Sequence, residues 1–526
     1  MANIKAKSSL LVFFIIWFIY IAFFSFVTML IRMDGYINFE PLFITSHINT
    51  LFDSGELVKN FFLSYPLLTN SLAYPFSIFS AEDAPFFASV FYTSLFATFV
   101  VTVVGKEKSN TLKGFVFLYF LVSPITIYTA TSGTSVYAFY ILYFFIFYYL
   151  FNYIKNFTTY HIAILSIILS LATFLDYRIL WLLPILFFYV FIFSLYGMKG
   201  LKSSNIIIKY IKTTQHHSLR RKFRGRLGSM IFIIGFFPVT SLLLYFIINY
   251  LMGNDFFYFY DSLDTKWNGN SIFSLLEINT ITSLDNRAVN NFSFFNIVLF
   301  ISPIFIFEII RHYKKPLNII ILSLVPLLLY TLLRDSNTNF MNLSYYVIII
   351  AAAIASIAAA TSNNLKFKKV SYLIYACLFS INIYGEYQYL KKSSFTSEQI
   401  YFNSVINKEQ NTTLLEYKEG GRYLAANTPE NAIVLCDRSI MYPLVAYNKD
   451  NNFFISNSST EFKNAIYNPT ENCDYIILSN AESPFYYYDK VEANFNNIEK
   501  NGLSVNDYRT KVIYFSNTFR ILKVIK

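Results

Sequence analysis

Charged side chains stand beside long apolar runs at several places in this sequence, where they are placed to do chemistry at a membrane boundary. Asp34 directly follows the first long apolar run, and Glu40 comes six residues later. Asp176 and Arg178 stand between two later apolar runs. A carboxylate held at a membrane surface can accept a proton from a hydroxyl while a lipid-borne group approaches from the bilayer. Ionisable residues in this position are often functional.

Each of these residues also has a structural explanation, and the sequence leaves both open. Asp34, near Arg32, is either a proton acceptor or part of an interfacial ion pair that ends a helix. The segment 37–51 has apolar residues at helical spacing, which predicts a helix along the membrane surface. Glu40 on that helix is either solvated or in contact with substrate. Asp176 and Arg178 either bind a ligand or cap a tight turn.

The elements that must position these residues are almost entirely apolar. The chain has 526 residues, of which 55% are hydrophobic and only 14% are charged. Because a soluble protein carries about 25% charged residues, an ordinary soluble enzyme is excluded, and the apolar content also excludes a disordered chain. Apolar runs long enough to approach the thickness of a bilayer core are predicted as membrane spans. Eleven such runs occur, at 10–31, 84–104, 114–130, 135–154, 161–176, 179–197, 229–251, 292–310, 317–333, 343–361 and 370–387.

The distribution of Lys and Arg predicts the orientation of these spans. With the N-terminus inside, the basic short loops all fall on the cytoplasmic side, as the positive-inside rule requires. The loop 198–228 alone has nine Lys or Arg residues and no acid. It either only sets the orientation or also lies on the anionic leaflet. The net charge of +11 therefore reflects membrane topology and not a nucleic-acid partner. We expect a multi-pass protein of a prokaryotic plasma membrane.

Two parts of the chain are predicted to lie outside the membrane on the opposite face. One is the long first outer loop, 32–83, which belongs to a transmembrane domain of residues 1–387. The other is an extracytoplasmic α/β domain at 388–526, in which Cys436 and Cys473 are either disulfide-bonded or two reduced thiols. Its predicted elements are a helix at 414–426, strands at 432–435 and 475–478, and a closing hairpin over 512–524.

This layout resembles the GT-C superfamily of polytopic glycosyltransferases, whose members include protein O-mannosyltransferases and the aminoarabinose transferase of lipid A. In that fold the first outer loop begins with an acidic residue, continues through a surface helix and a turn, and reaches a Tyr-Pro-rich stretch. The similar residues here are Asp34, 48–55, Tyr65-Pro66, Tyr74-Pro75, Val122-Ser123-Pro124, 131–135, 174–178 to Pro184, Arg334-Asp335 before Tyr345-Tyr346, and 423–429 leading into 432–435.

The resemblance implies that Asp34 is the general base, which activates an acceptor hydroxyl for attack on the anomeric carbon with inversion while polyprenyl phosphate leaves. Arg178 is the first candidate, and Arg334 the second, for the cation that stabilises the leaving phosphate. The expected substrate-binding residues are Glu40, Asp176, Arg178 and Arg334. Many relatives carry a second acid in the outer turn between spans three and four, where this chain has none in 131–135. We therefore expect no metal and no cofactor besides the polyprenyl-phosphate donor.

The expected partners are a lipid-linked sugar donor, membrane lipids, and an acceptor protein, lipid or glycan. A membrane transporter or a lipid-linked glycan flippase is the alternative, although it would need ionisable residues or broken helices near the bilayer midplane. A membrane scaffold whose outer domain binds a partner also stays open, as does a glycan polymerase or ligase. Fold-level resemblance does not name the sugar or the acceptor.

Overall fold

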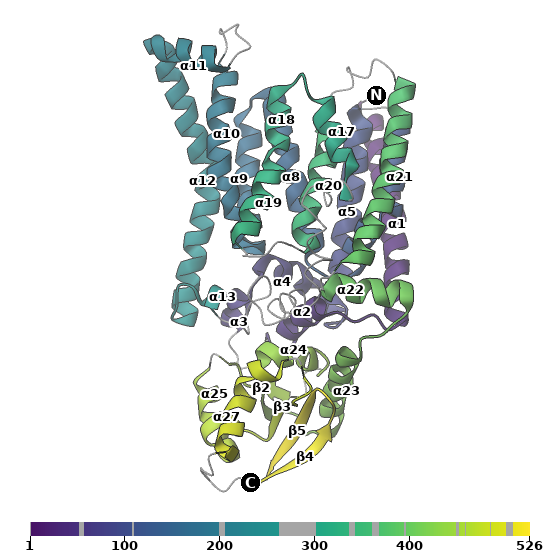
Figure 1. Cartoon of the computed structure of the whole chain (residues 1–526), viewed down its shortest axis with the longest axis vertical. Coiled ribbons are helices and arrows are strands. Elements are labelled where there is room, and N and C mark those ends of the chain that lie inside the picture. The colour runs from purple at the N-terminus through teal and green to yellow at the C-terminus, as the bar shows by residue number, and fades with distance from the viewer. Residues whose placement is uncertain are drawn as a thin grey trace.

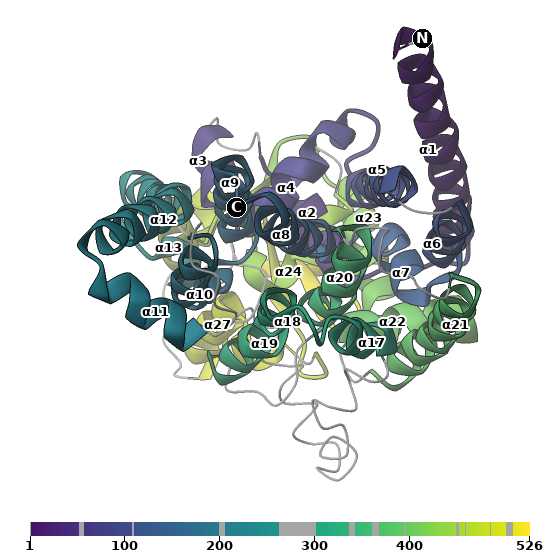
Figure 2. The same ribbon diagram turned by 90° about the horizontal axis from the view of Figure 1, so that it is seen from above.

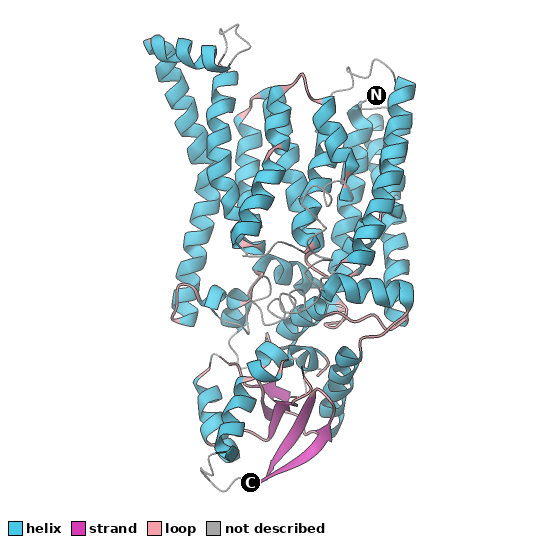
Figure 3. Ribbon diagram, in the orientation of Figure 1, coloured by secondary structure: helices cyan, strands magenta, loops and turns pink. Residues whose placement is uncertain are grey.

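The computed structural model consists of a long helical bundle with a smaller domain beneath one end (Figures 1 and 3). The bundle holds the apolar helices, and the smaller domain holds a five-stranded sheet. The structure describes residues 2–51, 57–107, 110–198, 206–261, 301–335, 342–359, 368–393, 396–448, 452–457, 459–483, 485–500 and 509–525.

Helices occupy every predicted span as far as the described residues reach. Within the described part, five helices are long and apolar enough to cross a membrane, or six if one bent pair is a single span. Other apolar helices are shorter, so the count of eleven crossings stays a prediction. The helices are α1 (Ala2–Met33), α5 (Ala84–Glu107), α6 (Asn110–Val122), α7 (Pro124–Thr131), α8 (Val136–Asn156), α9 (Thr159–Leu175), α10 (Leu182–Tyr196), α12 (His217–Gly253), α17 (Pro303–Arg311), α18 (Pro316–Leu322), α19 (Leu324–Asp335), α20 (Leu343–Ala359) and α21 (Lys368–Lys392).

The basic loops gather at one end of the bundle. Figure 1 shows α11 (Ile206–Gln215), the α17–α18 link and the N-terminal end opposite the C-terminal domain. The predicted loop 198–228 is helical over much of its length, because α11 is followed at once by the first turns of α12. The arrangement agrees with the threading predicted from the charges. The cytoplasmic placement of this end stays a prediction.

The span predicted at 114–130 is broken. Helices α6 and α7 meet at an angle of 58°, with Pro124 as the first residue of α7. A break inside a bilayer frees polar groups that need partners, since no water is available there. Glu386 of α21 accepts hydrogen bonds from the Ser123 hydroxyl (2.5 Å) and the Ile125 N–H (3.4 Å). This buried acid therefore stabilises the break.

The first outer loop folds into short helices beneath the bundle. Its first helix, α2 (Phe39–Asn49), confirms the helix predicted over 37–51, but nearly all of its residues are buried. The interpretation of Glu40 as a solvated residue is wrong, because its side chain is only 5% exposed. The loop continues through α3 (Leu57–Leu63), α4 (Leu67–Ala73) and η2 (Tyr74–Ile78).

The C-terminal domain is a mixed α/β fold, as predicted. The helix expected at 414–426 is α23, both single strands are present, and the closing hairpin is antiparallel. The strand order is β2-β1-β3-β5-β4, with β1 parallel to β2 and β3. Cys436 and Cys473 are buried free thiols. The elements are α23 (Thr412–Asn427), β1 (Ala432–Leu435), α24 (Arg438–Ala446), β2 (Asn452–Phe454), α25 (Thr460–Tyr467), α26 (Pro469–Asn472), β3 (Tyr475–Ser479), η6 (Tyr486–Tyr488), α27 (Lys490–Lys500), β4 (Arg509–Phe515) and β5 (Phe519–Ile525).

The smaller domain docks on the first outer loop. Helix α24, which follows the carboxyl end of β1, packs on α2 (Figure 1). Arg438 donates to the Thr50 hydroxyl (2.5 Å), and Asn49 donates to the Ala446 carbonyl (3.0 Å). Helix α21 runs past residue 387, and α22 (Thr396–Phe402) then leads toward the domain. The carboxyl edge of the parallel strands therefore faces the membrane domain.

Candidate active site

Asp176 and Arg178 form a buried ion pair between α9 and α10. Asp176 Oδ1 accepts the backbone N–H of Arg178 (2.9 Å), which lies in the short helix η3 (Tyr177–Trp181). The guanidinium contacts the same carboxylate, with Nε 3.2 Å from Oδ1 and Nη2 3.1 Å from Oδ2. Asp176 is 1% exposed and Arg178 is 9% exposed. The pair therefore caps the turn and also presents a fixed cation at the boundary of the bundle.

Tyr345 of α20 completes this pair. Its hydroxyl donates to Asp176 Oδ2 and accepts from Arg178 Nη2. The Arg178 Cζ atom lies 5.1 Å from the centre of the Tyr345 ring. Among the described residues, Arg178 Nη1 has no hydrogen-bond partner. Two N–H groups of a rigid guanidinium are thus left for an oxyanion.

Glu40 lies where two helices begin. It is in the first turn of α2, and its Oε1 accepts the N–H of Ser135 (2.8 Å), the residue that precedes α8. Carboxylates are stabilised at helix N-termini because the free N–H groups and the helix dipole favour negative charge. The turn at 131–135, which has no acid of its own, therefore provides a backbone donor to an acid from the first outer loop.

Both groups of charged residues are linked to the outer end of α8. Ser135, which binds Glu40, lies one turn from Phe139 on this helix. The ring of Phe139 packs against Tyr345, with 5.6 Å between the ring centres. Helix α9 packs against α8 in the bundle, and Figure 1 shows α2 beneath the bundle. Glu40 and the Asp176–Arg178 pair thus flank one region of the structure.

Tyr65 ties the first outer loop to the same region. Its hydroxyl accepts the N–H of Tyr177 (2.6 Å), the residue between Asp176 and Arg178. Burial raises the pKa of the Tyr65 phenol, and the negative charge of Asp176 raises it further. The Tyr-Pro stretch singled out in the sequence therefore holds the turn that carries the ion pair.

Asp34 lies apart from these residues. Its side chain is 45% exposed, and its ion pair is a loose one with the exposed Lys408, at 3.8 Å. Helix α1, which ends beside Asp34, is at one edge of the bundle, whereas α9 lies toward the other side in both views (Figures 1 and 2). Glu40, and not Asp34, is therefore the acid of the first outer loop that contacts the start of α8.

The structure describes few or no side-chain contacts for two other sequence-based suggestions. Arg334 is in the last turn of α19, but its side chain is not among those described. Most of the acidic outer loop 252–291 is likewise outside the described residues. The described residues contain no group of three His, Cys, Asp or Glu side chains able to hold a metal ion.

Sequence reasoning missed the roles of Tyr345 and Glu398. Glu398 of α22 accepts the N–H of Leu343 (2.5 Å) at the start of α20, the helix that carries Tyr345. Desolvation raises the pKa of the Glu398 carboxyl to about 7, although hydrogen bonds from Ser393 and Leu343 oppose the shift. Neither contact has a local sequence signal, since the partners lie more than 50 residues apart.

These features define a membrane protein with an extramembrane α/β domain and a buried charged site at the boundary between them. The fold is similar to that of ArnT from Cupriavidus metallidurans, a GT-C lipid A aminoarabinose transferase whose crystal structure has undecaprenyl phosphate bound. The TM-score is 0.50 at 11% sequence identity, with 99% of this chain and 98% of that chain covered. No protein-family model and no curated protein matches the sequence. The GT-C resemblance is thereby confirmed at the level of the fold.

Proposed function

We propose that this protein is an integral membrane glycosyltransferase that moves a sugar from a polyprenyl-phosphate donor to an acceptor outside the cytoplasm. The observation that carries the proposal is the buried Arg178, whose Nη1 donors are unused among the described residues of a GT-C fold. The undecaprenyl phosphate bound to ArnT supports a lipid phosphate as the donor. The acceptor is a hydroxyl of a protein, lipid or glycan.

The proposed reaction is a single displacement with inversion. A carboxylate removes the proton of the acceptor hydroxyl, and the oxygen attacks the anomeric carbon on the face opposite the phosphate. The bond between that carbon and the phosphate oxygen breaks, and polyprenyl phosphate leaves with the electron pair. Arg178 donates through Nη1 to the leaving phosphate, and its contacts with Asp176 and Tyr345 fix its orientation. A donor fixed in advance stabilises the developing charge without reorganisation.

Two carboxylates of the first outer loop compete for the role of base. The GT-C resemblance favours Asp34, which directly follows the first helix. The geometry supports Glu40, because it is buried beside α8 while Asp34 is 45% exposed at the edge of the bundle. A proton acceptor has to lie within reach of the reacting atoms. We therefore propose Glu40 as the base and treat Asp34 as the competing assignment.

The test uses membranes that contain the full chain, labelled polyprenyl-phosphate hexoses and endogenous acceptors. Glu40→Gln removes the basic group but keeps an oxygen that accepts the Ser135 N–H. We expect it to slow transfer by about 100-fold or more, the usual contribution of a general base. Asp34→Asn is the matched control, and its transfer rate should equal that of the wild type. The opposite result would assign the base to Asp34.

Further outcomes test the reaction class itself. If neither substitution slows transfer, neither Glu40 nor Asp34 is the base. Arg178→Lys keeps the charge but loses the planar fork, so transfer should fall while the amount of protein in the membrane is unchanged. Movement of the labelled lipid across the membrane without transfer of its sugar would instead identify a flippase.

A further inference from the structure

A groove separate from the proposed active site lies between α1 and α5, next to α23 of the outer domain. Its volume is about 400 Å³. The walls are formed by the last turns of α1 and the first turns of α5, including Met29 and Val90. Met29 is 62% exposed and Phe87, also in the wall, is 41% exposed. Because these turns belong to membrane-spanning helices, the groove opens toward the acyl chains of the leaflet nearest the outer domain.

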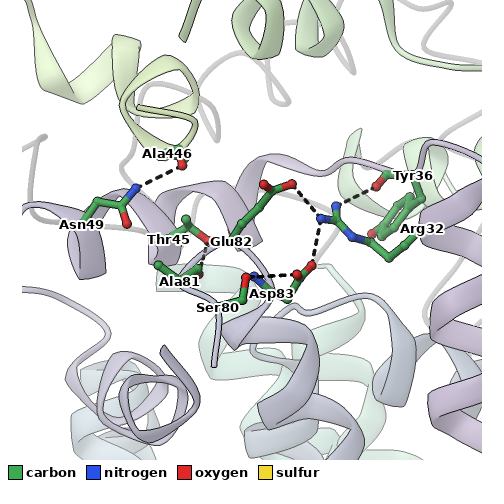
Figure 4. Close-up of polar contacts among 9 residues, drawn as sticks. All are labelled: Arg32, Tyr36, Thr45, Asn49, Ser80, Ala81, Glu82, Asp83 and Ala446. Carbon is green, nitrogen blue, oxygen red and sulfur yellow. Dashed lines mark hydrogen bonds and ion pairs between the residues drawn. The ribbon is translucent and has the colours of Figure 1, made fainter. Parts of the chain in front are cut away.

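Charged groups line only the end of the groove next to the outer domain. Arg32 lies there, and its Nη2 atom donates to Glu82 (2.8 Å) and Asp83 (3.0 Å), while Nη1 donates to the Tyr36 carbonyl (3.2 Å). Figure 4 shows the guanidinium held among these three groups. The Arg32 charge is therefore balanced within the protein, and its role is to fix the end of α1 against the end of the first outer loop.

Lys418 of α23 is the second cation in the groove, and its charge is less well balanced. The Nζ atom lies 5.9 Å from the centre of the Tyr447 ring. Desolvation lowers the pKa of Lys418, the positive charges of Arg422 and Arg32 lower it further, and Glu82 only partly opposes them. Positive neighbours that depress the pKa of a lysine create a local potential that favours an anion.

The polarity of the groove has the pattern of a lipid-binding site. A lipid needs an apolar channel for its chain and, at the interface, a group that complements its head. The two requirements are met by Met29 and Val90 along the helices and by Lys418 at the end next to the outer domain. We propose that this groove binds an anionic, phosphate-bearing lipid of the surrounding leaflet, with its phosphate on Lys418 and its chain between α1 and α5.

Two chemically related lipids fit this description, an anionic phospholipid and a polyprenyl phosphate. Native mass spectrometry of the detergent-solubilised full chain can distinguish them by titration with phosphatidylglycerol, undecaprenyl phosphate or phosphatidylcholine. We expect one tightly held anionic lipid and weaker retention of phosphatidylcholine. The anionic lipid that is retained at the lower concentration identifies the source of the phosphate. Equal retention of all three lipids would overturn the proposal.

Substitutions in the groove test whether the lipid binds there. Lys418→Glu should weaken retention about tenfold or more, since a charge-assisted contact is replaced by repulsion. Lys463→Glu makes the same change on the exposed side of α25 and should have no effect. Met29→Trp should fill the apolar part, whereas Leu30→Trp, at the same depth but outside the groove lining, should not. If Lys418→Glu and Met29→Trp retain lipid like their controls, the groove is not the site.

The result of the lipid-retention experiment does not depend on the proposed sugar-transfer reaction. None of the four substitutions changes Glu40, Asp176 or Arg178, and lipid retention is measured without any sugar donor. Folding is checked by the thermal unfolding of each variant in the same detergent. Loss of retention with an unchanged unfolding temperature supports the groove even if the protein transfers no sugar.

Discussion

Two arginine–carboxylate groups stand at the same boundary of this molecule in different surroundings. Arg178 is 9% exposed and is bound to the fully buried Asp176. Arg32 is 21% exposed and shares its charge between Glu82 and Asp83, of which Asp83 is 39% exposed. Burial, more than residue type, therefore decides what an ion pair can do. The buried pair has fixed geometry and spare donors, whereas the half-exposed group borders an open groove.

The two groups should differ most in the stability that is lost when each arginine is replaced. Arg178→Met leaves the Asp176 carboxylate buried without its cation, which costs about 3–5 kcal/mol in comparable pairs. Arg32→Met removes a partly solvated ion pair and should cost about 1 kcal/mol or less. Denaturant titration of the wild type and both variants in detergent measures the unfolding free energy of each. Equal losses of unfolding free energy would mean that the burial of Arg178 does not make its ion pair more important for stability than that of Arg32.

A double substitution separates the structural and chemical roles of the buried pair. Asp176→Leu combined with Arg178→Met removes both charges, so most of the lost stability should return. Sugar transfer should stay lost, because the phosphate has no donor. Recovery of transfer in the double variant would mean that Arg178 acts only through the fold.

The features that depend on local sequence pattern could be predicted from the sequence. Asp176 and Arg178 are two residues apart, so their contact was foreseeable, and the strands of the outer domain follow from short apolar segments bounded by turns. The hydrogen bond of Glu40 to Ser135 joins residues 95 positions apart, and Asp176 meets Tyr345 across 169 positions. Such contacts depend on how helices pack. For the same reason, the sequence could not tell that Asp34 is exposed while Glu40 is buried.

Glu398 is a buried acid without a described cation partner, and its substitution should change stability by an amount between those of the two arginine groups and the exposed pair. Glu398 is 1% exposed, receives hydrogen bonds, and has no ion pair among the described residues. Its pKa is raised to about 7 in the folded protein, whereas an unfolded glutamate titrates near 4.5. Between these values the folded state binds the extra proton, so its stability should fall by about 1 kcal/mol per unit as the pH rises. Glu398→Gln should remove this contribution.

The measurement for Glu398 is the unfolding free energy at pH 5, 6, 7 and 8 for the wild type and Glu398→Gln. Other groups titrate in both proteins, so the difference between the two curves isolates this residue. The stability of the wild type relative to the variant should decrease with rising pH and level off above about pH 7. Parallel curves would show that the Glu398 carboxyl does not titrate in this window.

The smallest effect is expected at the most exposed pair, Asp34 with Lys408. The two side chains are 45% and 72% exposed, and 3.8 Å separates Asp34 Oδ2 from Lys408 Nζ. Solvent screens such a pair, and the cost of ordering two side chains offsets most of the attraction. Lys408→Gln should therefore change the unfolding free energy by less than about 0.5 kcal/mol and leave sugar transfer unchanged. A large loss of transfer in this variant would show that the Asp34–Lys408 pair acts in the reaction, and it would return the role of base to Asp34.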